Sequence, residues 1–244
     1  MTDIILLIPL IFLAALVFSS VGHGGASAYL ATFALIGMAP ASMRPAALSL
    51  NVLVASIALY KFYKVGAFNW QLFWPIALMS VPAAFIGGQI TLPNPIYKAL
   101  VGASLIYAAW TIFSQANRID EITVKPVAKI VLMGLGAGLG FLAGLTGVGG
   151  GIFLSPILLF FSWAKTKVIS GVAAAFILVN SVSGLLGLLS KSPNLPAGLV
   201  YWALAAIAGG LIGAEYGSQK LANPTIRKLL ALVLLFAGSK LLLG

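Results

Sequence analysis

The chain has 244 residues, of which 61% are hydrophobic and only 7% carry a charge. A soluble domain carries about a quarter charged residues, so this composition excludes a soluble domain and predicts a polytopic membrane protein. The net charge of +10 would suit a nucleic-acid partner, but basic residues on a membrane protein usually report its topology, and we expect no nucleic-acid binding. The absence of cysteine excludes disulfides and thiolate metal sites.

The apolar segments fall into two sets of five, which we predict to be helices in a lipid bilayer. The first set lies at about 4–18, 26–38, 46–60, 70–91 and 96–114. A polar stretch, QANRIDEITVKP, follows at 115–126. The second set lies at about 127–144, 152–163, 168–189, 199–219 and 225–243. We therefore divide the chain into a first membrane repeat (1–114), a cytoplasmic linker (115–126) and a second membrane repeat (127–244).

A glycine cluster interrupts the first apolar pair of each set, SVGHGGAS at 20–27 and LTGVGGGI at 145–152. The segment after each cluster has only about 12–13 residues, which at 1.5 Å per residue covers about 18–20 Å of a hydrocarbon core about 30 Å thick. We therefore expect each broken pair to be a hairpin that enters and leaves the membrane on one side. Two full crossings are the alternative, which the charges alone leave open.

The two sets also match in their individual residues. Matching residues recur 125 or 129 positions later: Gly22, Gly24 and Gly25 as Gly147, Gly149 and Gly150, and Asn51 and Asn94-Pro95 as Asn180 and Asn223-Pro224. Membrane helices align easily because they share a composition, but these matches together favour duplication. With three full crossings after each hairpin, the halves have opposite orientations. The predicted fold is an all-α polytopic membrane protein with two inverted-topology repeats, each a glycine-broken helical hairpin plus three transmembrane helices.

The basic residues predict the orientation of this topology. One side receives ten of the 14 basic residues, namely Lys61, Lys64, Arg118, Lys125, Lys129, Lys165, Lys167, Lys220, Arg227 and Lys228. The other side receives Arg44, Lys98, Lys191 and Lys240. The positive-inside rule makes the first side cytoplasmic. We therefore predict that both termini lie outside.

Hairpins that enter from opposite faces would bring their tips together near the middle of the membrane. The helices that start near residues 26 and 152 would then direct their N-termini, each with about +0.5 charge and free N–H groups, at a shared anion site. Side-chain donors must add to this, because stripping water from an anion costs more than helix ends supply. The candidate substrate-binding residues are Ser20, Gly22, His23, Gly24, Gly25, Ser27, Asn51, Thr146, Gly147, Gly149, Gly150, Gly151, Asn180 and Ser181.

Several of these residues also have a purely structural interpretation. Asn51 and Asn180 would either line the site or bond neighbouring helices. His23 has no counterpart in the second half, where Val148 stands; it is either a turn histidine bonded to a carbonyl or a titratable group that serves the anion or a proton. Arg44 would either attract an anion or mark the membrane interface.

The sequence shows no pattern typical of an enzyme. Four acidic residues in the whole chain leave no carboxylate pair or metal cluster, and the glycine runs fit neither a Walker loop nor a dinucleotide fingerprint. We therefore expect no enzyme activity, no cofactor and no bound metal. Glu215, the one acid within an apolar segment, lies near Lys220, and we expect it to snorkel or to form a salt bridge rather than to relay protons.

The whole chain resembles the sulfite exporter TauE/SafE family, on the motifs GHGGASAYLATFALIG, GVGGGIFLSPILLF, AALSLN, KFYKVGAFNW and VNSVSGLLG. The resemblance implies that the glycines at 22, 24, 25, 147 and 149–151 are the family glycines and that Asn180 and Ser181 are its second-half polar pair. It also implies a permease of the bacterial inner membrane for small sulfur-containing anions. The chain departs from the family pattern at His23, and at Ala28–Leu35, which lacks the proline that Pro156 supplies in the second half.

These observations predict a secondary transporter that moves sulfite, sulfoacetate, thiosulfate or another small organic anion by alternating access. A passive anion channel is the first alternative, and a membrane scaffold without transport is the second. The expected partners are the anion and the lipid bilayer. A coupling ion, either proton or sodium, and a homo-oligomer are left open.

Overall fold

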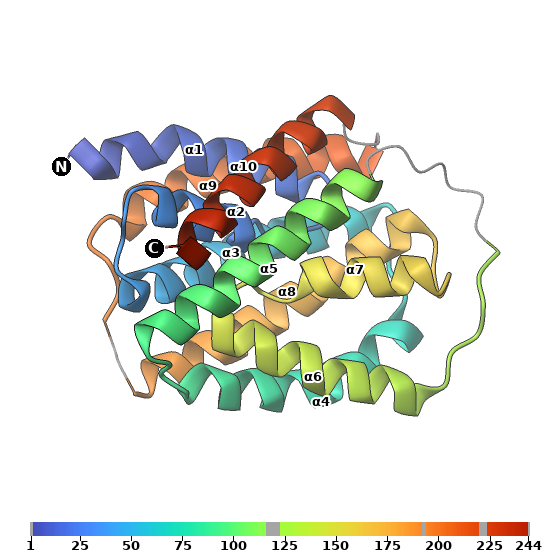
Figure 1. The fold of residues 1–244 in the computed structure, drawn as a ribbon. Coiled ribbons are helices and arrows are strands. Elements are labelled where there is room, and N and C mark those ends of the chain that lie inside the picture. Colours follow the sequence, from blue (N-terminus) through green and yellow to red (C-terminus); the bar gives the residue numbers. More distant parts are fainter. Residues whose placement is uncertain (1, 116–122, 192–193, 220–223, 244) are drawn as a thin grey trace.

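A computed structural model describes residues 2–115, 123–191, 194–219 and 224–243 (Figure 1). Over these ranges the chain forms ten α-helices and no strand: α1 (Thr2–Ser19), α2 (Ala26–Leu35), α3 (Pro40–Lys64), α4 (Trp70–Gln89), α5 (Asn94–Gln115), α6 (Lys129–Thr146), α7 (Gly151–Phe160), α8 (Thr166–Leu189), α9 (Leu199–Gln219) and α10 (Pro224–Leu243). The predicted all-helical class is confirmed. The largest difference in bounds is at α3, which begins at Pro40 rather than near residue 46, because proline suits the first turn of a helix.

Six of the described helices are long and apolar enough to cross a membrane: α3, α4, α5, α6, α8 and α9. Large apolar side chains are more than half exposed on the outside of the molecule, among them Trp74, Trp110, Ile130, Phe160 and Phe236. A soluble monomer rarely exposes so much contiguous apolar surface, whereas a lipid-facing surface must. The chain is therefore a multi-pass membrane protein. Most of the predicted linker, with Arg118, lies outside the described residues, as does Lys220.

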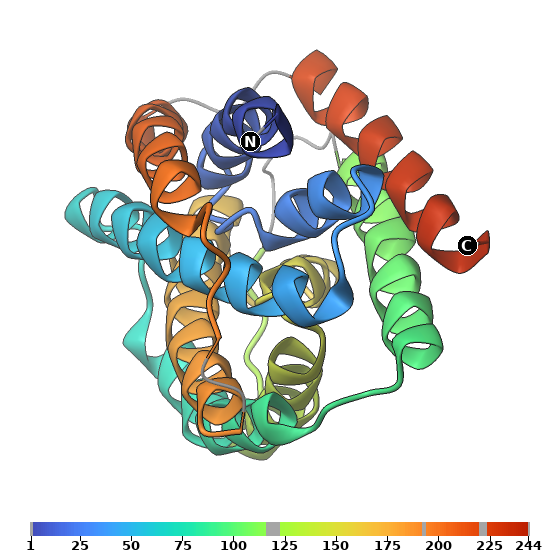
Figure 2. The ribbon, with the colours of Figure 1, turned by 90° about the vertical axis from the view of Figure 1, so that its left-hand side faces the viewer.

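The path of the chain contains two hairpins that enter from opposite ends of the molecule (Figure 1). Helix α1 runs inward from the end where the chain begins, and α2 returns to that end. Helices α6 and α7 do the same from the opposite end, where α5 ends. Helices α2 and α7 have 10 residues each, as the short second limbs predicted. The first turn of α1 and the last turn of α10 lie at the same end, the end that faces the viewer in Figure 2.

Glycines set the close packing of two helix pairs, α4 with α6 and α1 with α9. On α6 and on α9 they recur every four residues, at 136, 140 and 144 and at 209, 213 and 217. A Cβ at Gly144 would lie less than 3.0 Å from the Ala84 carbonyl, and one at Gly217 less than 3.0 Å from that of Ser20. Small residues at this spacing let membrane helices approach closely. The first to fifth helices of one half correspond to the sixth to tenth of the other, so α4 and α6 correspond to α9 and α1, as duplication implies. The inverted repeat itself stays our interpretation.

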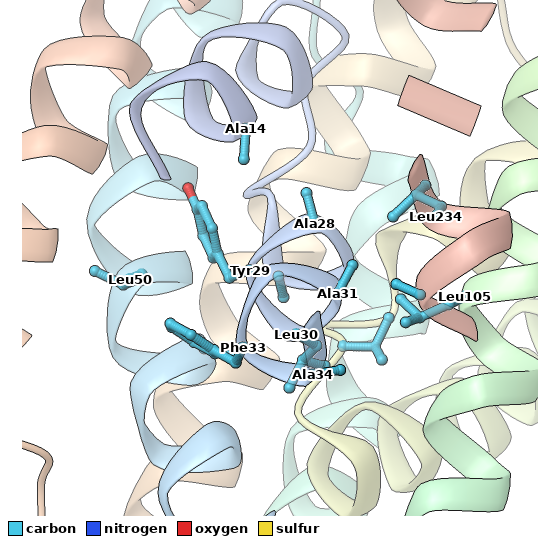
Figure 3. Packing of buried hydrophobic residues seen from close by; sticks show 14 of the residues in the cluster. Ala14, Ala28, Tyr29, Leu30, Ala31, Phe33, Ala34, Leu50, Leu105 and Leu234 are labelled. Carbon is cyan, nitrogen blue, oxygen red and sulfur yellow. The ribbon is translucent and has the colours of Figure 1, made fainter. Parts of the chain in front are cut away.

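The short helix α2 lies inside the protein rather than against lipid. Nine of its residues, from Ala26 to Ala34, are buried. Figure 3 shows Ala14 of α1, Leu50 of α3, Leu105 of α5 and Leu234 of α10 around it. An apolar helix too short to span a bilayer is therefore enclosed by four others, which also encloses the irregular turn that precedes it.

Candidate functional site

Both short helices begin directly after a glycine with a left-handed backbone. Gly25, at φ 96°, precedes α2, and Gly150, at φ 75°, precedes α7. Other residues rarely adopt these angles, so glycine allows the chain to reverse within a turn of a few residues. The N-terminal N–H groups of α2 and α7 are consequently placed in the interior of the molecule rather than at its surface.

The two hairpin tips meet at the side chain of Asn51, which α3 supplies. The Asn51 Oδ1 atom accepts a hydrogen bond from the backbone N–H of Ala26 at 2.9 Å, and its Nδ2 donates to Ser181 Oγ at 3.3 Å. A Cβ at either Gly24 or Gly149 would lie less than 3.0 Å from the Asn51 amide. Asn51 is fully buried. One amide therefore joins the first N-terminus, the second tip and α8; we call this contact the Asn51 junction.

Asn180, which matches Asn51 in the sequence, has different partners. Its Nδ2 donates to the Phe176 carbonyl of its own helix at 2.7 Å. Its Oδ1 is buried and has no hydrogen-bond partner among the described residues. The structure thus brings Asn51 and Ser181 to the tips, while Asn180 bonds along α8.

His23 links the first tip to α7. Its Nδ1 lies 3.1 Å from the Val21 carbonyl oxygen, and its Nε2 lies 3.2 Å from both the Gly151 carbonyl oxygen and Ser155 Oγ. Phe18 packs edge-on against the ring, with the ring centroids 6.4 Å apart. The His23 side chain therefore belongs to the contact between the two hairpins.

A cavity of about 90 Å³ opens beside His23, at the end of the molecule where α8 begins. Its polar lining consists of hydroxyls, the imidazole and one ammonium, from Ser20, His23, Ser155, Thr166, Lys167 and Ser170. We call it the His23 cavity. A cavity of this volume holds several waters or one small anion. No acidic side chain from the described part of the chain lines it.

Arg44 is buried against the ends of α4 and α6. Its guanidinium donates to the Gly144 carbonyl from Nε (3.0 Å) and Nη2 (2.5 Å), and to three carbonyls at the end of α4, those of residues 87, 88 and 90. A positive charge at two helix C-termini is favourable. Arg44 and Lys191 also line a second cavity of about 290 Å³, at the end opposite the His23 cavity. The guanidinium therefore lies inside the protein, and its predicted anion-attracting role stays a prediction.

The other predicted site residues fall into two groups. Ser20 lines the His23 cavity while donating to the Val17 carbonyl, and Gly22 packs on Ser170. Away from the cavity, Thr146 bonds the Leu142 carbonyl of its own helix, Gly147 packs on Arg44, and Ser27 is buried.

The sequence did not predict four polar residues of the cavity lining, namely Ser155, Thr166, Lys167 and Ser170. Ser155 had a signal, since it stands four residues after Gly151 and so shares its helix face. Glu215 forms a salt bridge with Lys61 of α3; Lys220, which the sequence places near Glu215, lies outside the described residues.

These features define a polytopic helical membrane protein with a polar junction buried between two hairpins. The chain belongs to the sulfite exporter TauE/SafE family, whose model matches residues 7–241. It is similar to the probable membrane transporter protein y4hK of Sinorhizobium fredii, with 36% identity over 235 residues and 95% of each chain covered. It is also similar to the probable membrane transporter protein MJ0441 of Methanocaldococcus jannaschii, with 24% identity over 200 residues, 77% of this chain and 73% of the relative. No solved structure matches the chain. The protein is thus a membrane transporter, in agreement with the expectation that it is not an enzyme.

Proposed function

We propose that this transporter moves small sulfur-containing or organic anions, such as sulfite, sulfoacetate or thiosulfate, across the bacterial inner membrane by alternating access. The observation that carries the proposal is the Asn51 junction, where two glycine tips and the start of α2 meet beside the His23 cavity. The family name supports the substrate class.

The chemistry of the cavity favours an anion. Helix N-termini attract negative charge, by up to about 2 kcal/mol each when partly buried. The lining adds hydroxyl donors and the Lys167 ammonium, with no carboxylate among the described lining residues. A cation would meet like charge and few acceptors there, whereas an anion finds both charge and hydrogen bonds.

The positions of the two cavities favour alternating access over a channel. They open at opposite ends of the molecule, the second one beside Arg44, and the Asn51 junction lies between them. Such an arrangement does not suggest a continuous pore. Inverted repeats that exchange conformations would open each end in turn.

The basic residues support an orientation for this cycle. With ten of the 14 basic residues on the cytoplasmic side, the His23 cavity faces the cytoplasm, Arg44 lies on the outer side and both termini are outside.

The test is counterflow of radioactive thiosulfate in proteoliposomes. A carrier preloaded with unlabelled thiosulfate exchanges it for label, saturates with concentration and is inhibited by sulfite. Flux that never saturates and shows no counterflow would favour the channel. If no anion among sulfite, sulfoacetate and thiosulfate binds or crosses, the proposal fails, and a scaffold role becomes the better explanation.

A further inference from the structure

His23 is the only histidine in the 244 residues, and its two ring nitrogens face oxygen atoms from both hairpins. Nδ1 lies 3.1 Å from the Val21 carbonyl oxygen in the first tip. Nε2 lies 3.2 Å from the Gly151 carbonyl oxygen, at the first residue of α7. These two atoms are carbonyl oxygens, which accept hydrogen bonds and never donate them.

A neutral imidazole carries one N–H donor, so it can satisfy one of these two carbonyls but not both. The doubly protonated imidazolium satisfies both at once and joins the two hairpins. Ser155 Oγ, also 3.2 Å from Nε2, offers the alternative. When Nε2 loses its proton, the Ser155 hydroxyl can donate to the exposed lone pair, and the bond to Gly151 is lost.

We propose that His23 is the binding site of a coupling proton, and that its protonation makes and breaks the hydrogen bond between the first tip and α7. This inference rests on the proposed function. Protonation adds one proton to the Nε2 lone pair and forms Nε2–H···O=C with Gly151. Deprotonation releases that proton to water in the His23 cavity. The bare Nε2 then accepts a hydrogen bond from the Ser155 hydroxyl.

The surroundings of His23 link this proton to the anion. Lys167 of α8 is the other titratable group among the described lining residues. The residues that α1, α3, α5, α7 and α9 contribute to the lining have apolar side chains or hydroxyl groups, or are glycine. An anion in the cavity would therefore face the imidazolium and one ammonium, with no carboxylate among the described lining residues to compete. Anion and proton then favour each other's binding by the same factor, as linkage requires. The cargo would be a net acid, an anion with its proton.

Because the chain has one histidine, nuclear magnetic resonance of ¹⁵N-histidine protein, purified with a histidine-free tag, reports this residue alone. We expect the neutral form to keep its proton on Nδ1, the tautomer that is disfavoured in water, because Ser155 can serve only a bare Nε2. A neutral form protonated on Nε2 would overturn the proposed exchange of Nε2 between the Gly151 carbonyl and the Ser155 hydroxyl. This measurement needs no substrate. Saturating thiosulfate, which stays unprotonated near neutral pH, should raise the titration midpoint by about 0.7–2 pH units for a typical 5–150-fold coupling. An unchanged midpoint would overturn the coupling.

Flux measurements with an entrapped pH dye complete the test. The wild-type protein should move protons with thiosulfate in a fixed ratio. His23→Gln should slow the transport of the anion and abolish the proton movement that accompanies any remaining anion flux. An unchanged ratio of protons to thiosulfate in this variant would overturn the proposal. Ser155→Ala removes the donor to neutral Nε2, so it should raise the pH midpoint of transport, and an unchanged or lowered midpoint would contradict the Ser155 exchange. Anion flux without protons in the wild-type protein would refute the proton site alone, whereas absence of any anion flux would refute the proposed function.

Discussion

The Asn51 junction predicts a loss of stability in the variant Asn51→Ala. The same substitution at the matched residue, Asn180→Ala, serves as its control. Asn51→Ala and Asn180→Ala remove the same side-chain atoms from two fully buried positions. The two variants differ in the hydrogen bonds that they remove. Asn51 joins three parts of the molecule, whereas the side chain of Asn180 bonds, among the described residues, only the Phe176 carbonyl of its own helix.

The difference in unfolding free energy follows from these bonds. A side-chain hydrogen bond in a membrane protein is worth about 0.6 kcal/mol on average, so losing two costs about 1.2 kcal/mol. The Ala26 N–H is then left without its acceptor, which adds about 1–3 kcal/mol. Asn51→Ala should therefore lose about 2–4 kcal/mol beyond the cavity cost. Asn180→Ala loses one bond but also removes a buried oxygen that has no partner among the described residues, and these effects offset each other to within about 1 kcal/mol.

The assay is thermal unfolding in detergent, followed by tryptophan fluorescence. For a chain of this length each kcal/mol corresponds to about 2–4 °C by soluble-protein scaling. We expect the Asn51 variant to melt several degrees below the Asn180 variant. Equal melting temperatures, or a lower one for Asn180→Ala, would refute the assignment of Asn51 to the junction. Stabilisation by added thiosulfate separates the two interpretations of Asn51, because a residue that only joins helices leaves this stabilisation intact.

Three further substitutions test the tip, the guanidinium and the cavity. Gly149→Ala should abolish transport, because its Cβ would collide with the Asn51 amide; Gly66→Ala shares the left-handed backbone but has open space, so it should lose only about 1–2 kcal/mol of stability and keep transport. Arg44→Lys cannot span the ends of α4 and α6 with one ammonium, and its melting temperature should fall below that of the wild-type protein. Lys167→Gln should raise the KM for thiosulfate several-fold, while Lys165→Gln, exposed on the same side but outside the cavity lining, should leave it unchanged, as counterflow can measure.

The fold could be predicted from the sequence because lipid imposes a simple rule on it. A helix that crosses a bilayer needs an apolar run of about 20 residues, so the two shortest segments, each directly after a glycine cluster, are marked as too short to cross. The glycine clusters then mark where each hairpin turns. The bounds of α2, predicted at 26–38 and found at Ala26–Leu35, show how well this rule works.

The partners of individual side chains could not be predicted in the same way. Asn51 and Asn180 have the same residue type and matching sequence positions, yet one meets the opposite hairpin and the other its own helix. That difference depends on how α3 and α8 are rotated about their axes, which composition does not encode. Glu215 and Arg44 are similar cases, since their partners on α3, α4 and α6 become neighbours only after the helices pack.

The Arg44 bonds also limit which parts can move during the proposed cycle. These contacts use at most four N–H groups of the guanidinium, because Nη2 has two hydrogens for three carbonyls. At about 1.5 kcal/mol for each hydrogen bond from a charged group, at the low end, they amount to about 6 kcal/mol. An anion that binds at millimolar concentration supplies only about 4 kcal/mol, and it can shift an equilibrium only by its differential affinity for the two states. We therefore expect that such an anion does not break all of these bonds.

We therefore predict that the beginning of α3 and the ends of α4 and α6 move together as one body, with the glycine contact between α4 and α6 adding to its rigidity. The absence of native cysteine makes this testable with pairs of introduced cysteines carrying spin labels. A pair across α4 and α6 should keep one distance with and without thiosulfate, while a pair across the two hairpin tips should change. A thiosulfate-dependent distance between α4 and α6 would show that the Arg44 bonds do break, and that the outer end opens through them.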